Sequence, residues 1–249
     1  MTAMPIGRFA ADPDSLAGAV RSVARSHLGL VRAINEDRVF DCPDRCVWAV
    51  ADGMGGHAGG DLAAQAVVDR LRSLTTGDRT IRFVDMLVAL GQANGDIRQR
   101  NDRLRTSAGA TVVAAMIEGG TAHIAWAGDS RAYRLRHDGL DLLTRDHSVV
   151  QELVDAGLLT ADRADNHPQS HVVTRALGVD DDPRLQTVSV RLKPGERLLL
   201  CSDGLSRSLA ATDAVGETID VLGDRLLANA LARDGSDNVS LVLIELPTR

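Results

Sequence analysis

One local pattern recurs in this sequence: an apolar run that adjoins an aspartate with a small or polar neighbour. The copies are Val50-Ala51-Asp52-Gly53, Ala127-Gly128-Asp129-Ser130, Cys201-Ser202-Asp203-Gly204 and Gly235-Ser236-Asp237-Asn238. Each apolar run has the length and composition of a buried strand, and only the last aspartate precedes its run. A strand end fixes the backbone, and a small neighbour lets a cation reach the carboxylate and a main-chain carbonyl together. The sequence therefore favours a fold in which several strand ends converge.

Converging carboxylates repel one another strongly unless cations lie between them. Their oxygen-only character suits hard ions, Mg²⁺ or Mn²⁺, better than zinc. Asp-Gly and Asp-Asn are also common turn dipeptides, so a turn explains any single copy of the pattern. The occurrence of all the copies beside apolar runs favours a metal site.

A second segment, Arg32-Ala33-Ile34-Asn35-Glu36-Asp37, places a basic residue close to two adjacent acids. Alone, it is better explained as a surface strand end with a weak salt bridge. Beside a metal cluster it indicates a phosphate-binding site, because the guanidinium group of an arginine can donate two hydrogen bonds to phosphate oxygens. The two acids would then bind metal or metal-bound water.

A glycine-rich segment runs from Asp52 to Gly60 into a helical pattern and superficially resembles a dinucleotide-binding loop. Its spacing departs from the G-x-G-x-x-G pattern, and an aspartate at the strand exit would face a pyrophosphate unfavourably. The chain also lacks G-x-x-x-x-G-K-[ST]. These features exclude a P-loop nucleotidase and argue against a nucleotide-binding oxidoreductase.

The composition limits the class of protein. The chain has 249 residues, of which 44% are hydrophobic, and this suits one large globular domain or at most two small ones. A formal net charge of −6 argues against a nucleic-acid partner. Since no apolar run of about 20 residues appears, and the N-terminus lacks the apolar core of a secretory signal, we expect no membrane contact.

The cysteines Cys42, Cys46 and Cys201 are few and odd in number, which indicates a reducing compartment. Cys42 and Cys46 would supply half of a zinc site, but no second Cys or His pair accompanies them at ligand spacing. We therefore expect a cytoplasmic protein, and a monomer by default.

Residues 1–20 show little periodicity and are interpreted as a loose N-terminal extension. Beyond them the sequence predicts buried strands at Val47–Ala51, Thr111–Ile117, His123–Trp126, Ala132–Leu135, Arg197–Cys201 and Ser240–Leu246. Helical periodicity covers Asp61–Leu74, Val84–Arg100, Asp220–Arg233 and the short stretch Val149–Ala156. In the first of these, Leu62, Ala66, Val67, Leu71 and Leu74 share one apolar stripe. The polar stretch 148–178 is either an active-site lid or a surface excursion. This order of elements is typical of α+β layers.

Together these segments resemble the metal-dependent protein phosphatases of the PPM, or type 2C, family, in its bacterial serine/threonine phosphatase branch. The matching motifs are Arg32-x-x-Asn35-Glu36-Asp37, Asp52-Gly53-Met54-Gly55-Gly56-His57, Gly109-Ala110-Thr111, Gly128-Asp129-Ser130-Arg131, Asp146-His147-Ser148, Thr174-Arg175-Ala176-Leu177-Gly178, Ser202-Asp203-Gly204-Leu205 and Asp237-Asn238. They follow the family order and cover roughly residues 21–247. The resemblance implies a four-layer α-β-β-α sandwich, in which two antiparallel sheets are flanked by helices and the metal centre lies at one end. It also implies a variable flap at about 148–178.

The resemblance further implies two metal ions, Mn²⁺ or Mg²⁺, with a possible third. Asp52, Asp203 and Asp237 would hold the first ion. Asp52 and the Gly53 carbonyl would hold the second, with Glu36 as a direct or water-mediated partner. Asp129, together with Asp203, resembles the weaker third site.

The remaining site residues take their roles from the same resemblance. Arg32 would grip the substrate phosphate, Asp37 would hydrogen-bond metal-bound water, and Asn238 would support the cluster beside Asp237. The eukaryotic branch has a histidine directly after Asp-Gly, whereas this chain has Met54. His57 lies nearby in the sequence and either assists catalysis or packs against the helix.

The chemistry that follows is hydrolysis of phosphoserine or phosphothreonine. Two cations about 3.5–4 Å apart would share a water, lower its pKa and generate a hydroxide that attacks phosphorus in line. Arg32 and the metals would neutralise charge on the equatorial oxygens. We expect such an enzyme to act in signalling by opposing a serine/threonine kinase, with a link to type VI secretion as one hypothesis.

Three other functions remain open at this point. A pseudophosphatase of the same family would act as a regulatory module, although such proteins usually lose metal carboxylates or the phosphate arginine, all of which are present. A metal hydrolase for small phosphoesters would differ in its relative activity on phosphopeptides. A nucleotide-binding oxidoreductase would bind dinucleotide tightly without divalent metal.

Overall fold

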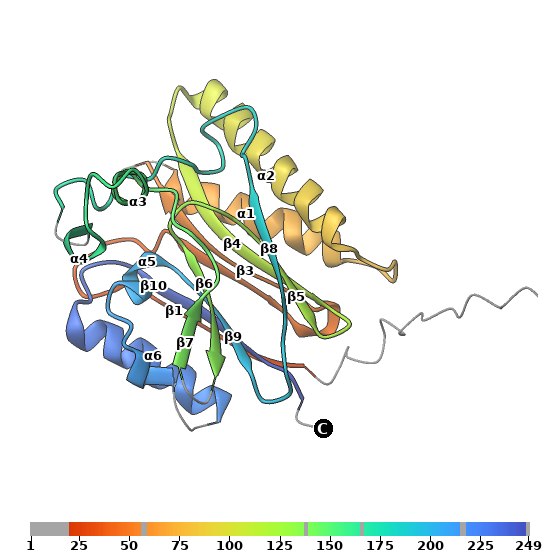
Figure 1. Cartoon of the computed structure of the whole chain (residues 1–249). Coiled ribbons are helices and arrows are strands. Elements are labelled where there is room, and N and C mark those ends of the chain that lie inside the picture. Colours follow the sequence, from red (N-terminus) through yellow and green to blue (C-terminus); the bar gives the residue numbers. More distant parts are fainter. Residues whose placement is uncertain (1–19, 56–58, 137–138, 165–166, 215–217, 248–249) are drawn as a thin grey trace, which may run out of the picture.

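The computed structural model describes residues 20–55, 59–136, 139–164, 167–214 and 218–247. In this part of the chain, ten strands form two five-stranded antiparallel sheets that pack face to face. Helices cover the outer face of each sheet (Figure 1). The predicted α+β class and its α-β-β-α layers are confirmed. Almost all of the predicted N-terminal extension falls outside the described residues.

The first sheet has the strand order β1-β10-β9-β6-β7. Its strands are β1 (Arg21–His27), β10 (Val239–Glu245), β9 (Arg197–Cys201), β6 (Arg131–Arg136) and β7 (Gly139–Leu142). The second sheet has the order β2-β3-β4-β5-β8. Its strands are β2 (Asp37–Cys42), β3 (Val47–Met54), β4 (Gly109–Glu118), β5 (Thr121–Ala127) and β8 (Gln186–Arg191).

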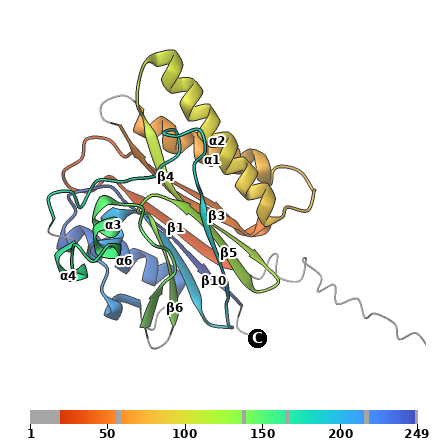
Figure 2. The same ribbon diagram turned by 45° about the horizontal axis from the view of Figure 1, so that its top comes forward.

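The long helices α1 (Gly60–Thr75) and α2 (Phe83–Leu104) cover the second sheet, and α6 (Ile219–Arg233) covers the first, as two views show (Figures 1 and 2). Short helices are α3 (Val149–Asp155), α4 (Ala161–Ala164) and α5 (Asp203–Ser206), and two 3₁₀ turns span Pro43–Arg45 and Ala211–Ala214. Of the helices in the described ranges, none has the length and apolarity needed to cross a membrane.

Helix α1 buries Val67, Leu71 and Leu74 of the apolar stripe that its periodicity predicts, but it leaves Leu62 near the surface. Ala63, Ala64, Val67 and Leu71 are buried against the second sheet. Leu62, which the sequence places on the apolar stripe, is 39% exposed. Ala63 and Ala64 complete the buried stripe, so Leu62 lies at the rim of the contact between α1 and the sheet.

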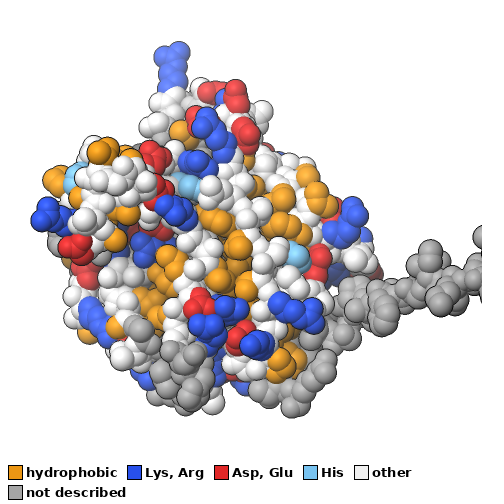
Figure 3. Space-filling model, in the orientation of Figure 1, with side chains coloured by type: hydrophobic (Ala, Val, Ile, Leu, Met, Phe, Trp, Pro, Cys, Tyr) orange, Lys and Arg blue, Asp and Glu red, His pale blue; other side chains and the backbone are white. Residues whose placement is uncertain are grey.

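The apolar residues form three layers, one between the two sheets and one beneath the helices on each side. The layer between the sheets contains Trp48, Val113, Leu200 and Val242, all fully buried. Hydrophobic side chains also show in the middle of the face seen in Figure 3, where Figure 1 draws β5, β8 and β6, and charged side chains surround them. The sandwich is thus held together mainly by burial of aliphatic surface.

The segment between Ser148 and Gly178 carries α3 and α4 and lies at the same end of the sandwich as α5 (Figure 1). Its two ends pair with each other, because Ser148 and Val173 form an antiparallel bridge. The Thr174 N–H donates to the His147 carbonyl at 2.7 Å. The chain therefore enters this segment and leaves it at neighbouring positions on the sandwich.

Candidate active site

The strand register brings Asp37 and Asp52 together, since they face each other across β2 and β3. Asp37 is buried, and its Oδ2 accepts a hydrogen bond from the Ser202 hydroxyl at 2.8 Å. Its Oδ1 has no hydrogen-bond partner among the described residues. Because Ser202 follows β9 of the other sheet, this contact joins the two sheets at the acidic end.

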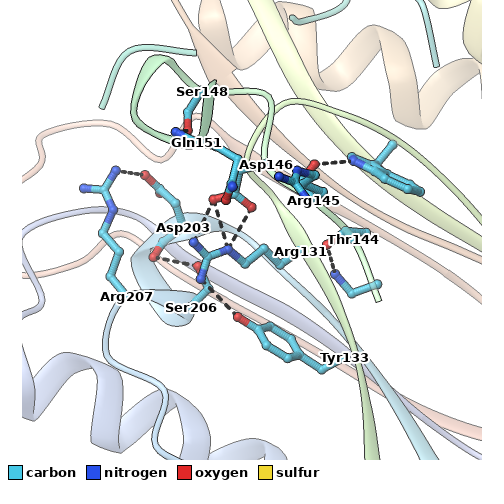
Figure 4. A network of polar contacts seen from close by, with 12 residues as sticks. Arg131, Tyr133, Thr144, Arg145, Asp146, Ser148, Gln151, Asp203, Ser206 and Arg207 are labelled. Carbon is cyan, nitrogen blue, oxygen red and sulfur yellow. Dashed lines mark hydrogen bonds and ion pairs between the residues drawn. The ribbon is translucent and has the colours of Figure 1, made fainter. Parts of the chain in front are cut away.

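Asp203 begins α5 directly after β9, and its carboxylate is paired with a nearby arginine. Arg207 Nη2 lies 2.6 Å from Asp203 Oδ2, one helical turn further along the chain (Figure 4). Arg207 is not among the site residues that the sequence patterns predict. The i,i+4 spacing of an acid and a base within a helix was the signal that would have found it.

Asp237 lies just before β10 and contacts the arginine that the sequence assigns to phosphate. Arg32 Nη2 lies 2.8 Å from Asp237 Oδ2. The Arg32 side chain is 52% exposed, so much of the guanidinium is open to an incoming group. The structure thus places Arg32 at the rim of the acidic cluster.

Asn238 fixes the loop that carries Arg32 and Glu36. Its side-chain amide donates to the carbonyl oxygens of Leu28 at 2.8 Å and Ile34 at 3.1 Å. Its Oδ1 accepts from the Glu36 N–H at 2.8 Å. The buried amide therefore satisfies three backbone groups of one loop, and its supporting role in the cluster stays a prediction.

Gly53 lies where three segments approach closely. Its N–H donates to the Glu36 carbonyl at 3.2 Å. A Cβ atom at Gly53 would overlap the Gly60 carbonyl oxygen, and one at Gly60 would overlap Glu36 Oε1. The two glycines leave room for the Glu36 carboxylate, a cradle that any larger residue would fill.

Asp129 follows β5 through Gly128, whose φ of +113° requires glycine. The Gly128 N–H donates to Nδ1 of the buried His147 at 3.1 Å, and the His147 N–H returns a bond to the Gly128 carbonyl at 3.0 Å. This pair holds the loop that presents Asp129. His147 therefore has a structural role here.

A cavity of about 290 Å³ lies between this loop, α5 and the 148–178 segment. Asp129, Asp203 and His171 are among the residues that line it. On its wall, Arg131 grips Asp146 with a fork, Nε at 2.9 Å and Nη2 at 2.7 Å (Figure 4). The cavity gives Asp129 and Asp203 a common opening.

The site disfavours negative charge. Burial raises the pKa of Asp37 to about 7, and burial together with the charge of Asp203 raises the pKa of Asp129 to about 7. The pKa of Asp52 lies well above its ordinary value, because of burial first and then the charges of Asp37, Asp203, Asp129 and Asp237. The five carboxylates thus interact electrostatically, and a positive ligand would relieve their repulsion.

The residues fit divalent cations by their chemistry: oxygen donors only, an orphaned buried oxygen on Asp37 and a cradle at Gly53. Among the described residues, no three His, Cys, Asp or Glu side chains stand as a complete set of ligands around one point. The ion pairs of Arg32 with Asp237 and of Arg207 with Asp203 turn two of the carboxylates toward arginines. His57 lies outside the described residues, and its assignment stays a prediction.

A pH dependence of stability follows from these pKa shifts for the metal-free protein. Asp37 and Asp129 have pKa values of about 7 when folded and about 3.9 when unfolded, so the native state binds more protons between these values. The free energy of unfolding should fall, by on the order of a few kcal/mol, as the pH rises from about 4 to 7. Thermal unfolding of EDTA-treated protein at pH 5.0 and 7.5 measures this. Asp129→Asn should flatten the dependence, and an unchanged slope would contradict the assignment.

Comparison with known proteins identifies the family. The family model of Protein phosphatase 2C matches residues 31–236. The serine/threonine protein phosphatase PstP of Mycobacterium tuberculosis is 36% identical over 236 residues, which are 91% of this chain and 45% of PstP. The chain thus spans about half the length of this relative.

Solved structures agree with this match. PppA, a key regulatory component of T6SS in Pseudomonas aeruginosa, superposes with a TM-score of 0.83 at 36% identity over 92% of this chain and 99% of PppA. The catalytic domain of PstP in complex with two manganese ions superposes with a TM-score of 0.80 at 32% identity, over 92% and 98% of the two chains. The chain therefore belongs to the protein phosphatase 2C, or PPM, family, in its bacterial serine/threonine phosphatase branch.

Proposed function

We propose that this chain is a metal-dependent protein serine/threonine phosphatase, which hydrolyses phosphoserine and phosphothreonine in other proteins. The observation that carries the proposal is the placement of Arg32 at the rim of a carboxylate cluster, 2.8 Å from Asp237. A site that combines oxygen ligands for cations with a half-exposed arginine is suited to a phosphate ester.

Asp52, Asp203 and Asp237 would hold the first ion, and Asp52, the Gly53 carbonyl and Glu36 the second. Manganese in the homologous PstP domain supports two ions of this kind, with Mg²⁺ as the alternative. When bound, such ions neutralise phosphate charge and lower the pKa of water, so that a nucleophile exists at neutral pH. Asp129 and Asp203 share a cavity, which supports a possible third ion there.

The protein's own residues would orient the ester. Arg32 donates a planar fork of N–H groups that matches two phosphate oxygens, and only its Nη2 is engaged with Asp237. Asp37, held by Ser202 through Oδ2, has Oδ1 free to accept a hydrogen bond from the attacking water. The segment 148–178 would act as the flap that shapes substrate choice.

The cellular setting is part of the same proposal. Phosphoserine and phosphothreonine arise from kinases, so the enzyme would oppose a serine/threonine kinase as part of a signalling pathway. The 36% identity to PppA supports a connection with type VI secretion. The cysteines Cys42, Cys46 and Cys201 are free thiols, which supports a reducing, cytoplasmic location. We expect a monomeric protein without nucleic-acid or membrane partners.

The test is hydrolysis of a phosphothreonine peptide by EDTA-treated protein, with and without added Mn²⁺. Turnover should appear only with the metal and should fall by at least about 1,000-fold in Asp203→Ala, because a carboxylate that would serve two ions is lost. Asp224→Ala, which removes an exposed carboxylate paired with Arg25, is the matched control and should keep full turnover. Folding of each variant is checked by circular dichroism.

Two results would contradict the proposal. Absence of turnover with every divalent metal, in folded protein, would support a regulatory pseudophosphatase. Turnover of small aryl phosphates without any turnover of phosphopeptides would support a hydrolase for small phosphoesters.

A further inference from the structure

A groove of about 560 Å³ borders the acidic site on the side of α1 and α2. Its volume lies within the range of sites that bind ligands or several side chains of a peptide. The residues that matter for its chemistry are Arg32, Ala33, Ile34, Leu62, Arg100 and Leu104, and we refer to it as the Arg32 groove.

The Arg32 groove has an apolar wall built from three separate segments. Ile34 in the loop after β1 is 60% exposed, Leu62 at the start of α1 is 39% exposed, and Leu104 at the end of α2 is 50% exposed. A contiguous group of exposed apolar side chains that is rimmed by polar residues is typical of an interaction site. The displacement of Leu62 from the buried face of α1 contributes directly to this wall.

The charges around the groove are two basic and two acidic groups: Arg32, Arg100, Glu36 and Asp61. Asp61 already faces Arg38 at 3.7 Å, and Glu36 belongs to the acidic site. Arg100 forms no ion pair or hydrogen bond with any residue that the structure describes. Its positive charge is therefore available to a negatively charged partner.

The groove is continuous with the acidic site through Arg32, which lines the groove and also contacts Asp237. A phosphate held by Arg32 would place the neighbouring residues of its own chain at the mouth of the groove, because successive residues of an extended chain are only about 3.3 Å apart. This continuity favours the substrate polypeptide itself as the ligand of the groove.

We propose that the Arg32 groove binds the substrate polypeptide beside the phosphorylated residue and selects a large aliphatic side chain together with an acidic one. The aliphatic side chain packs against Ile34, Leu62 and Leu104, and the acidic side chain pairs with Arg100. This inference rests on the proposed phosphatase function and names the class of phosphoprotein that the site prefers.

The test compares phosphothreonine peptides in which a Leu and an Asp flank the phosphoresidue, on either side, with peptides that carry alanine at these positions. With Mn²⁺ present, kcat/KM should be about ten-fold higher for the Leu/Asp peptide in one of the two orientations. Hydrolysis of p-nitrophenyl phosphate is followed in parallel, because this small ester reports on the acidic site without reaching the groove.

Two variants assign the preference to its residues. Leu104→Ser should remove the preference for leucine over alanine, and Arg100→Glu should remove the preference for aspartate over alanine. Val88→Ser, which replaces a residue that is 55% exposed on the same helix and does not line the groove, is the matched control and should keep both preferences.

The outcomes separate this inference from the proposed function. Equal preferences in wild type, Leu104→Ser and Val88→Ser would overturn the groove assignment while leaving the phosphatase intact. If the wild type hydrolyses neither peptides nor p-nitrophenyl phosphate, the proposed function fails. Fluorescence anisotropy of the same peptides then still measures the groove, and equal affinities for all of them overturn the inference as well.

Discussion

Asp52→Asn is expected to abolish metal-dependent phosphatase turnover, with a loss of at least about 1,000-fold in kcat, and at the same time to stabilise the metal-free protein. Activity is lost because Asp52 is the carboxylate that both ions would share. Stability is gained because the pKa of Asp52 is raised by burial and by the surrounding aspartates, so its charged form destabilises the fold. The neutral amide has nearly the same shape and avoids this cost.

Both halves of this expectation are measurable on one preparation. Phosphothreonine peptide hydrolysis with Mn²⁺ gives the activity, and thermal unfolding in EDTA at pH 8.5 gives the stability. Asp69→Asn, an exposed carboxylate on α1, is the control and should alter neither quantity appreciably. An Asp52→Asn protein that is inactive and also less stable in EDTA would show that the carboxylate is structural.

Gly53→Ala is expected to damage both the fold and the site, with a loss of about 3 kcal/mol or more in the free energy of unfolding. A Cβ atom at this position would overlap the Gly60 carbonyl oxygen and would come within 2.9 Å of the Glu36 carbonyl oxygen. Both are backbone atoms, so the overlap is removed only if β3, α1 and the loop that carries Arg32 and Glu36 move apart. Metal-dependent turnover should also disappear, because Gly53 would no longer lie close to Gly60 and Glu36.

Urea unfolding and peptide hydrolysis measure the two effects. The matched control is Gly95→Ala on the exposed side of α2, where a new Cβ atom would meet nothing within 4 Å. That change should instead stabilise the protein by about 0.5–1 kcal/mol, because alanine favours a helix more than glycine does. If Gly53→Ala keeps wild-type activity and stability, the expectation is wrong, and β3, α1 and the loop that carries Glu36 separate at little cost.

The sequence predicted the interior strands and the three long helices but missed β1, β2, β7 and β8. These four are the edge strands of the two sheets. An edge strand is covered on fewer sides and carries more polar residues, as in Gln186–Arg191 of β8, so its apolar pattern is weak. The interior strands, such as Val47–Met54, are buried throughout most of their length and were easily recognised.

Some features of the candidate site could be predicted from local sequence patterns, and others could not. Its carboxylates were predictable because each follows or precedes a buried strand, and antiparallel order brings such ends to one edge. The partners of these carboxylates were not, because Ser202 bonds Asp37 over a separation of 165 residues and Arg32 meets Asp237 over 205. Such pairings depend on how the two sheets stack, and local sequence patterns do not encode that.

The acidic site draws its residues from both sheets, with Asp37 and Asp52 on one and Asp203 and Asp237 beside the strands of the other. The hydrogen bond from Ser202 to Asp37 spans the seam between them. The spacing of the carboxylates is consequently a measure of the alignment of the two sheets. Any force that shears one sheet against the other, from a bound partner or from a repacked interior, changes the separation of these oxygens directly. The geometry of the acidic site thus depends on how the two sheets stack.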